Sequence, residues 1–152
     1  MKFDKFLIEN RDKIIDIYFD MDGVFAEYDI GNFDYKTIRP IKSVINIMNN
    51  LKRDGMNVKV LSICKNNKVV DEKHVWIDNF VPFLKKEDLV FLLKEENPGI
   101  ESNELKSNYL KNNINKDHVN ILIDDDSLII KKVVKENEDV KVFHVSSIIR
   151  WV

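Results

Sequence analysis

Short apolar runs alternate along the chain with longer segments in which apolar residues recur every three or four positions. The short runs predict buried strands over residues 14–20, 58–62, 89–93, 119–123 and 140–143. The periodic segments predict amphipathic helices over residues 40–54, 69–80, 105–110 and 128–134, with further short helices over 3–12 and 146–151. Pro40 and Gly55 bound the helix over 40–54, as expected of residues that favour helix starts and helix ends.

This regular alternation of strands and helices predicts an α/β fold. We expect a Rossmann-like three-layer sandwich, in which a central parallel sheet carries helices on both faces. No repeat, low-complexity tract or Pro/Gly-rich linker divides the 152 residues, so a single domain over 1–152 is expected. Ligands of such sheets bind beyond the carboxyl ends of the strands, where the strand order reverses.

The composition is that of an ordinary globular protein, with 44% apolar and 33% charged residues. The net charge of −2 predicts neither a nucleic-acid polymer nor a membrane as partner. The single cysteine, Cys64, excludes an internal disulfide and fits a reducing compartment. No signal peptide is visible, and no apolar run approaches the roughly 20 residues that span a bilayer. We therefore predict a cytoplasmic protein. A homo-oligomeric state is compatible with the sequence.

The most informative local feature is an acidic turn directly after the first strand. Asp20 and Asp22 lie two residues apart in Asp20-Met21-Asp22-Gly23, and two converging carboxylates are costly unless a hard cation such as Mg²⁺ neutralises them. Calcium loops also contain Asp-x-Asp-Gly. That alternative fails because Val24 and Tyr28 stand where oxygen ligands are needed and Gly31 stands where a bidentate Glu is required. The pattern therefore predicts a metal or phosphate site.

Polar residues also stand at the ends of two other predicted strands. Ser62 closes the strand over 58–62, and Asp124 follows the strand over 119–123. The carboxyl ends of parallel strands meet at one edge of the sheet, so both side chains are expected near Asp20.

These residues resemble the motifs of the haloacid dehalogenase (HAD) phosphatase superfamily. Asp20-Met21-Asp22-Gly23-Val24 is similar to its first motif, and Ile121-Leu122-Ile123-Asp124-Asp125 is similar to its fourth. The second motif is a Ser or Thr that closes an apolar strand, which Ser62 matches. A response-regulator receiver domain combines similar residues, but there the acidic pair follows the first strand and the phosphoacceptor follows the third. The order in this chain favours the HAD resemblance.

The third HAD motif is a lysine that neutralises the phosphate and the nucleophile. Lys106 is the expected match, because it opens a helix shortly before the fourth strand. Lys94, at the end of the third strand, is the rival, followed by Lys86.

Within the superfamily, the chain looks most like the 5′-nucleotidase family, which includes the 5′(3′)-deoxyribonucleotidases and their short bacterial and phage relatives. The resemblance rests on residues 20–26, on Glu72-Lys73-His74-Val75-Trp76-Ile77 with Pro82, and on residues 122–125. The segment 25–39 is too short for the helical cap of the larger enzymes, so we expect a minimal cap there. The sequence after Ser62 also departs from the larger enzymes.

The resemblance implies a Mg²⁺-dependent phosphatase that acts on small phosphate monoesters, and first of all on (deoxy)nucleoside 5′-monophosphates. Asp20 would attack the phosphorus to give an aspartyl-phosphate, and Asp22 would protonate the leaving oxygen and later activate water. Mg²⁺ would be held by Asp20, Asp124 and the backbone carbonyl of Asp22, while Ser62 and Lys106 would bind the phosphate. Asp125 would hold a metal-bound water or the lysine.

A second hypothesis from another class is a non-enzymatic HAD-like module that binds a phosphorylated ligand or a protein partner. The Asp22 carboxylate counts against it, because a pure binder has no use for an acid–base group.

Substrate recognition is expected in the short segment 25–39. It carries Phe25, Tyr28, Phe33 and Tyr35, in a chain of which only 10% is aromatic. Aromatic rings stack on nucleobases, so one or two of these side chains could hold a base. The alternative is that Phe25 and Phe33 seal the core beside the first strand.

Overall fold

The computed structural model of the protein describes residues 2–149 and contains one five-stranded sheet in the order β3-β2-β1-β4-β5. The strands are β1 (Ile15–Phe19), β2 (Asn57–Cys64), β3 (Leu89–Leu93), β4 (Val119–Asp124) and β5 (Val140–His144). Every neighbouring pair is parallel, so the prediction of an α/β fold with a central parallel sheet is confirmed.

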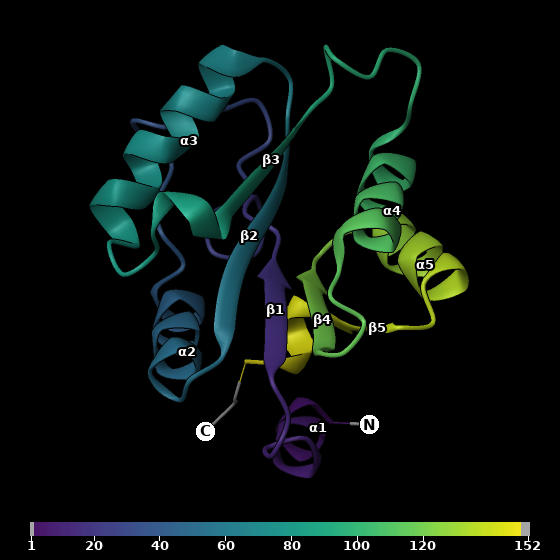
Figure 1. The fold of residues 1–152 in the computed structure, drawn as a ribbon. Coiled ribbons are helices and arrows are strands. Elements are labelled where there is room, and N and C mark those ends of the chain that lie inside the picture. Colours follow the sequence, from purple (N-terminus) through teal and green to yellow (C-terminus); the bar gives the residue numbers. More distant parts are fainter. Residues whose placement is uncertain (1, 150–152) are drawn as a thin grey trace.

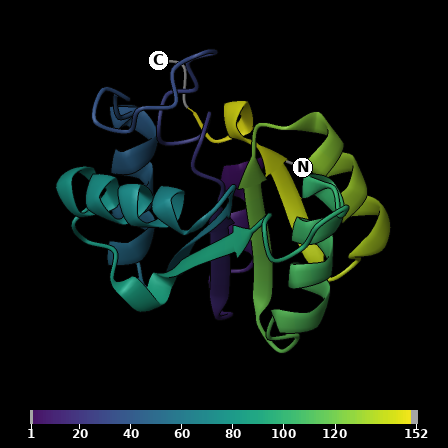
Figure 2. The same ribbon diagram turned by 90° about the horizontal axis from the view of Figure 1, so that it is seen from above.

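Helices cover both faces of this sheet. They are α1 (Phe3–Glu9), α2 (Lys42–Arg53), α3 (Asn67–Phe80), α4 (Ser102–Asn113) and α5 (Ser127–Glu136), with a 3₁₀ turn at Lys86–Asp88. Helices α2 and α3 lie on one side of the sheet and α4 and α5 on the other (Figures 1 and 2).

The predicted helix over 146–151 is replaced by a 3₁₀ turn at Val145–Ser147. The ring of His144 begins this turn, because its Nδ1 accepts a hydrogen bond from the backbone N–H of Ser146. Residues 150 and 151 of the predicted helix lie outside the described residues.

The central strand β1 is buried on both faces, which explains why all of its residues except Asp16 are apolar or aromatic. On one face Ile17 and Phe19 belong to a core cluster that includes Met48 of α2 and Ile77 of α3. On the other face Tyr18 packs in a second cluster with residues of α4 and α5. A strand fixed from both sides gives a rigid base for the residues that follow it.

The strand order reverses between β1 and β4. These neighbours pair through Phe19 and Ile123 near their carboxyl ends. The chain leaves β1 toward α2 on one face and leaves β4 toward α5 on the other (Figure 1). Diverging connections of this kind open a crevice at the strand ends, where parallel sheets bind ligands.

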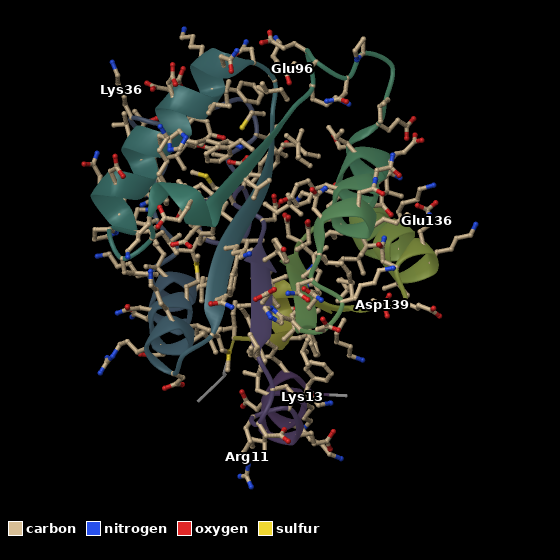
Figure 3. All side chains as sticks on the ribbon, viewed as in Figure 1. Arg11, Lys13, Lys36, Glu96, Glu136 and Asp139 are labelled. Carbon is tan, nitrogen blue, oxygen red and sulfur yellow. The ribbon has the colours of Figure 1, made fainter. Side chains whose placement is uncertain are left out.

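The segment 25–39 forms turns without a helix or an extended strand, and it returns close to its starting point through bridges of Ala26 with Asp22 and with Pro40. The indole Nε1–H of Trp76 donates to the carbonyl of Ile38 at 2.9 Å, which joins the segment to α3. In Figure 3 the labelled Lys36 of this segment lies beside α3, at the end of the molecule toward which the strands point.

The two phenylalanines of this segment have different environments. Phe25 is fully buried in the core, as the packing alternative predicted, whereas Phe33 is 78% exposed and does not seal the core.

Across the described part of the chain, no helix has the length and apolar character that a membrane crossing requires.

Candidate active site

The first acidic turn is held against the end of β4. The backbone N–H of Asp20 donates to the carbonyl of Ile123 at 2.9 Å, so the pairing of β1 and β4 continues to the first residue of the turn. Gly23 has a φ of +82°, and a Cβ atom at that position would lie 2.1 Å from Oδ2 of Asp125. Only glycine allows this approach, which brings the first and the last acidic segments together.

Lys106 lies between the two acidic segments. Its Nζ donates to Oδ1 of Asp20 at 2.8 Å and to Oδ2 of Asp124 at 2.7 Å. The Lys106 side chain is 1% exposed, and that of Asp124 is fully buried. Burial lowers the pKa of Lys106, but the carboxylates of Asp20 and Asp124 outweigh that effect and hold the pKa above its usual range. Lys106 is therefore a buried cation.

The Asp20 carboxyl lies at the wall of the site, with 13% of its side chain exposed. Burial raises the pKa of Asp20 to about 7; the charge of Lys106 opposes this rise and that of Asp124 adds to it. Carboxylate oxygens of Asp20, Asp124 and Asp125 lie within 4.8 Å of one another. One lysine cannot neutralise three carboxylates, and an oxygen cluster of this kind fits a hard divalent cation such as Mg²⁺.

The two adjacent aspartates after β4 have different surroundings. Oδ1 of Asp124 accepts the backbone N–H groups of Asp125 and Asp126 at 2.8 and 3.0 Å, and Oδ2 accepts Lys106. Asp125 is half-buried and lines the open cleft. Burial, together with the charge of Asp124, raises the pKa of Asp125. Asp126 begins α5, because its carboxylate accepts the backbone N–H groups of Leu128 and Ile129.

Ser62 lies on β2 beside this cluster and is fully buried. The strand does not end at Ser62 as predicted. It continues to Cys64, because β2 pairs with β3 as far as the Cys64–Leu93 pair.

Sequence reasoning gave Lys73 of α3 no role in the site. Its side chain is 1% exposed, and its Nζ donates to Oγ of Ser62 at 2.7 Å, to Oδ2 of Asp22 at 3.0 Å and to the carbonyl of Ile63 at 3.1 Å. The signal that could have found it is its position on the apolar stripe of α3, which also contains the buried Trp76 and Ile77. A lysine on a buried stripe requires an anion as partner.

Asp22 also contacts the segment 25–39. The Tyr35 hydroxyl donates to Oδ1 of Asp22 at 2.7 Å. Burial and the neighbouring Asp22 raise the pKa of Tyr35, so its hydroxyl keeps the proton.

A cleft of about 430 Å³ opens beside these side chains, lined by Asp20, Asp22, Tyr28, Ser62, Ile63, Ser102, Lys106, Asp125, Asp126 and Ile129. Asp20, Asp22, Ser62 and Lys106 therefore share one cavity, with Asp124 directly behind them. Tyr28 lines the same cleft and is 64% exposed.

The other two candidate lysines lie apart from this cleft. Lys94 donates to the carbonyl of Ile100 in the loop before α4. Lys86 is exposed on the 3₁₀ turn before β3.

No protein-family model and no curated protein matches the chain. Chains in several solved structures match it, and two of them illustrate the shared fold. A chain in a structure of the Pnkp1/Rnl/Hen1 complex has a TM-score of 0.66 and 18% identity over 86% of this chain. A chain in a structure of the Pnkp1/Rnl/Hen1 RNA repair complex has a TM-score of 0.68 and 17% identity over 88% of this chain. The matched regions are 45% and 42% of those chains, so this chain spans less than half of their length.

At this level of identity, the likeness establishes a Rossmann-like α/β fold. It also corrects the sequence-based exclusion of nucleic-acid polymers as partners. That exclusion is wrong, because it rested on a net charge of −2, and the same fold occurs in a chain of an RNA repair complex. A weak overall charge does not exclude an RNA partner, since contacts with nucleic acid depend on local charge.

Proposed function

We propose that the chain is a Mg²⁺-dependent phosphatase of the HAD type that hydrolyses phosphate monoesters. The observation that carries the proposal is the contact of one buried ammonium, Lys106, with both Asp20 and Asp124, in a cleft that Asp22 and Ser62 also line. A nucleophile, an acid–base carboxylate, a hydroxyl donor and a fixed cation together supply what phosphoryl transfer needs.

In the first step, a carboxylate oxygen of Asp20 attacks the phosphorus while the bond from phosphorus to the leaving oxygen breaks. Asp22 gives its proton to that oxygen. In the second step, Asp22 takes a proton from water, the water oxygen attacks the phosphorus, and the bond to Asp20 breaks. Ser62 and Lys106 hold the phosphoryl oxygens through both steps.

Bound Mg²⁺ would neutralise charge on the phosphoryl group. Asp20 and the backbone carbonyl of Asp22 remain the expected ligands. Between the two later aspartates, the geometry favours Asp125 as a direct ligand, because it faces the cleft, whereas both oxygens of Asp124 are occupied by protein donors. Asp124 then acts by holding Lys106.

Nucleoside monophosphates remain a proposed substrate class, with Tyr28 as the residue that would stack on the base. Tyr28 is exposed at the mouth of the cleft, whereas the hydroxyl of Tyr35 is engaged by Asp22. Tyr28→Ala should raise KM for nucleoside 5′-monophosphates several-fold and leave p-nitrophenyl phosphate turnover nearly unchanged.

A second candidate substrate is a phosphate at the end of an RNA strand. The similarity to chains of an RNA repair complex favours it. The segment 25–39, which lines the cleft through Tyr28, also contains no helix.

The test is phosphate release with Mg²⁺ from p-nitrophenyl phosphate, nucleoside monophosphates and oligoribonucleotides that carry a terminal phosphate. Turnover that EDTA abolishes and Mg²⁺ restores is the expected result. A folded protein that releases phosphate from none of these substrates would contradict the proposal. The kcat/KM values decide whether nucleoside monophosphates or RNA ends are the better substrates.

A further inference from the structure

The side chain of Asp22 is held on both of its carboxylate oxygens by donors from two different elements. Tyr35, in the segment 25–39, donates to Oδ1 at 2.7 Å, and Lys73, on α3, donates to Oδ2 at 3.0 Å. The two donors also contact each other, because the Lys73 ammonium lies 5.6 Å from the centre of the Tyr35 ring, within the range of a cation–π interaction. Asp22 itself is 33% exposed and faces the cleft.

Two hydrogen bonds that fix the Asp22 carboxylate have a specific use in this turn. Asp22 lies in a turn, and its side chain would otherwise sample several rotamers in contact with solvent. A group that moves a proton must stay within hydrogen-bond distance of the reacting oxygen, and a misplacement of about 1 Å can cost two orders of magnitude in rate.

Lys73 also acts on the phosphate-binding hydroxyl. An ammonium can only donate, so Oγ of Ser62 must accept at the 2.7 Å contact. The hydroxyl hydrogen of Ser62 is thereby directed away from Lys73 and can be donated to a phosphate oxygen. The third N–H of Lys73 is fixed by the carbonyl of Ile63, so this ammonium has no rotational freedom left.

We propose that Tyr35 and Lys73 are positioning residues for phosphoryl transfer: together they hold Asp22 toward the leaving oxygen, and Lys73 also orients Ser62. The inference rests on the proposed phosphatase function and adds two residues to it. It also gives the segment 25–39 a role in the chemistry, through Tyr35, in addition to any contact with the substrate.

The competing explanation is that Asp22 simply neutralises a buried lysine and that the whole arrangement serves the fold. The two explanations predict different dependence on the leaving group. Phenyl phosphate and p-nitrophenyl phosphate have nearly the same shape, but phenolate needs a proton as it leaves, whereas p-nitrophenolate is a stable anion and leaves without one. Loss of a positioned acid therefore affects phenyl phosphate selectively, whereas a damaged fold affects both substrates.

The primary test is Tyr35→Phe, which removes one oxygen atom and keeps the ring in place. We expect kcat/KM to fall about tenfold for phenyl phosphate and less than about twofold for p-nitrophenyl phosphate. A tenfold loss is the expected size because the variant lacks one hydrogen bond to a charged group. Tyr109→Phe is the matched control, because Tyr109 is a half-buried tyrosine on α4 that does not line the cleft. It should change neither value.

A second test combines Tyr35→Phe with Asp22→Asn. If Tyr35 acts through Asp22, adding Tyr35→Phe to Asp22→Asn should cost almost nothing further, whereas independent structural damage would multiply the two losses.

Lys73→Met should show the same selectivity for phenyl phosphate and, in addition, a higher KM for both substrates, because Ser62 loses its orientation. Lys52→Met is its control, since Lys52 is a half-buried lysine paired with Asp88 outside the cleft.

Equal losses on both phosphates in Tyr35→Phe, or multiplying losses in the double variant, would overturn the inference while leaving the phosphatase function intact. A wild-type protein that hydrolyses neither phosphate would instead overturn the proposed function.

Discussion

Lys106 Nζ lies 2.8 Å from Oδ1 of Asp20, although 86 positions separate the two residues in the sequence. The parallel sheet produces this contact, because α4 leads into β4 and β4 lies next to β1. A second contact, with Asp124, makes Lys106 the shared partner of the first and the last acidic segments. The other two polar groups of the cleft, Asp22 and Ser62, are held by a different ammonium, that of Lys73.

Replacement of Lys106 should affect both activity and stability. Lys106→Met leaves Asp20 and Asp124 without their buried cation, and breaking a buried ion pair typically costs about 3–5 kcal/mol. We expect a large loss of thermal stability, partly recovered with Mg²⁺, and a loss of at least a hundredfold in kcat/KM.

Lys94→Met is the matched control for that variant, because the Lys94 ammonium donates to the carbonyl of Ile100 in a loop and does not line the cleft. It should retain most of the activity. A strong loss in Lys94→Met together with an active Lys106→Met would reverse the assignment of the phosphate-binding lysine.

The two adjacent aspartates after β4 should differ in Mg²⁺ affinity. Asp125→Asn removes a carboxylate that faces the cleft, so we expect it to weaken Mg²⁺ binding at least tenfold in a calorimetric titration. Asp124→Asn removes a buried partner of Lys106 and should lower stability more than Mg²⁺ affinity. The opposite pattern would return the direct metal contact to Asp124.

The pKa of Asp20 predicts how the metal-free protein responds to pH. An unfolded Asp has a pKa of about 3.9, whereas the folded value is about 7. The folded state therefore binds this proton more tightly, and this contribution to stability is lost as pH rises from about 4 to 7.

We expect the Tm of the metal-free wild type to fall, relative to Asp20→Asn, across that interval. Mg²⁺ should stabilise the wild type more at pH 8 than at pH 5, because metal binding requires the carboxylate form. A difference between wild type and Asp20→Asn that does not change with pH would contradict the raised pKa.

Gly23 provides a test of the close approach between the acidic turns. Gly23→Ala and Gly55→Ala both place a side chain at a positive φ, but only at Gly23 would the new Cβ meet another residue, at 2.1 Å from Asp125. The difference between the two variants isolates that contact. We expect Gly23→Ala to lose most phosphatase activity and Mg²⁺ affinity, and Gly55→Ala to lose neither.

Most of the fold could be predicted from the sequence because its strands are short apolar runs bounded by polar turns. The central strand shows this most clearly, since both of its faces are buried. The 3₁₀ turn at Lys86–Asp88 could not be predicted, because one turn of this type has no periodic pattern of its own.

The residues of the site were predictable to different degrees. Asp20 directly follows β1, and Ser62 and Asp124 lie on the neighbouring parallel strands β2 and β4. Their positions in the chain therefore indicate that they converge. Lys73 and Tyr35 reach the site from a helix and from an irregular segment, whose spatial position depends on packing such as the Trp76–Ile38 hydrogen bond. Nothing in the local sequence of either residue encodes its distance from Asp22.

The most direct test of the phosphatase proposal is a comparison of the wild type with Asp20→Asn in Mg²⁺-dependent hydrolysis of p-nitrophenyl phosphate, with thermal unfolding measured in parallel. Asn keeps the shape of the side chain but removes the attacking charge and a metal ligand, so the variant should be folded and at least about a hundredfold less active. A folded Asp20→Asn protein that retains more than about a tenth of the wild-type activity would contradict the account, because covalent catalysis contributes far more than that factor.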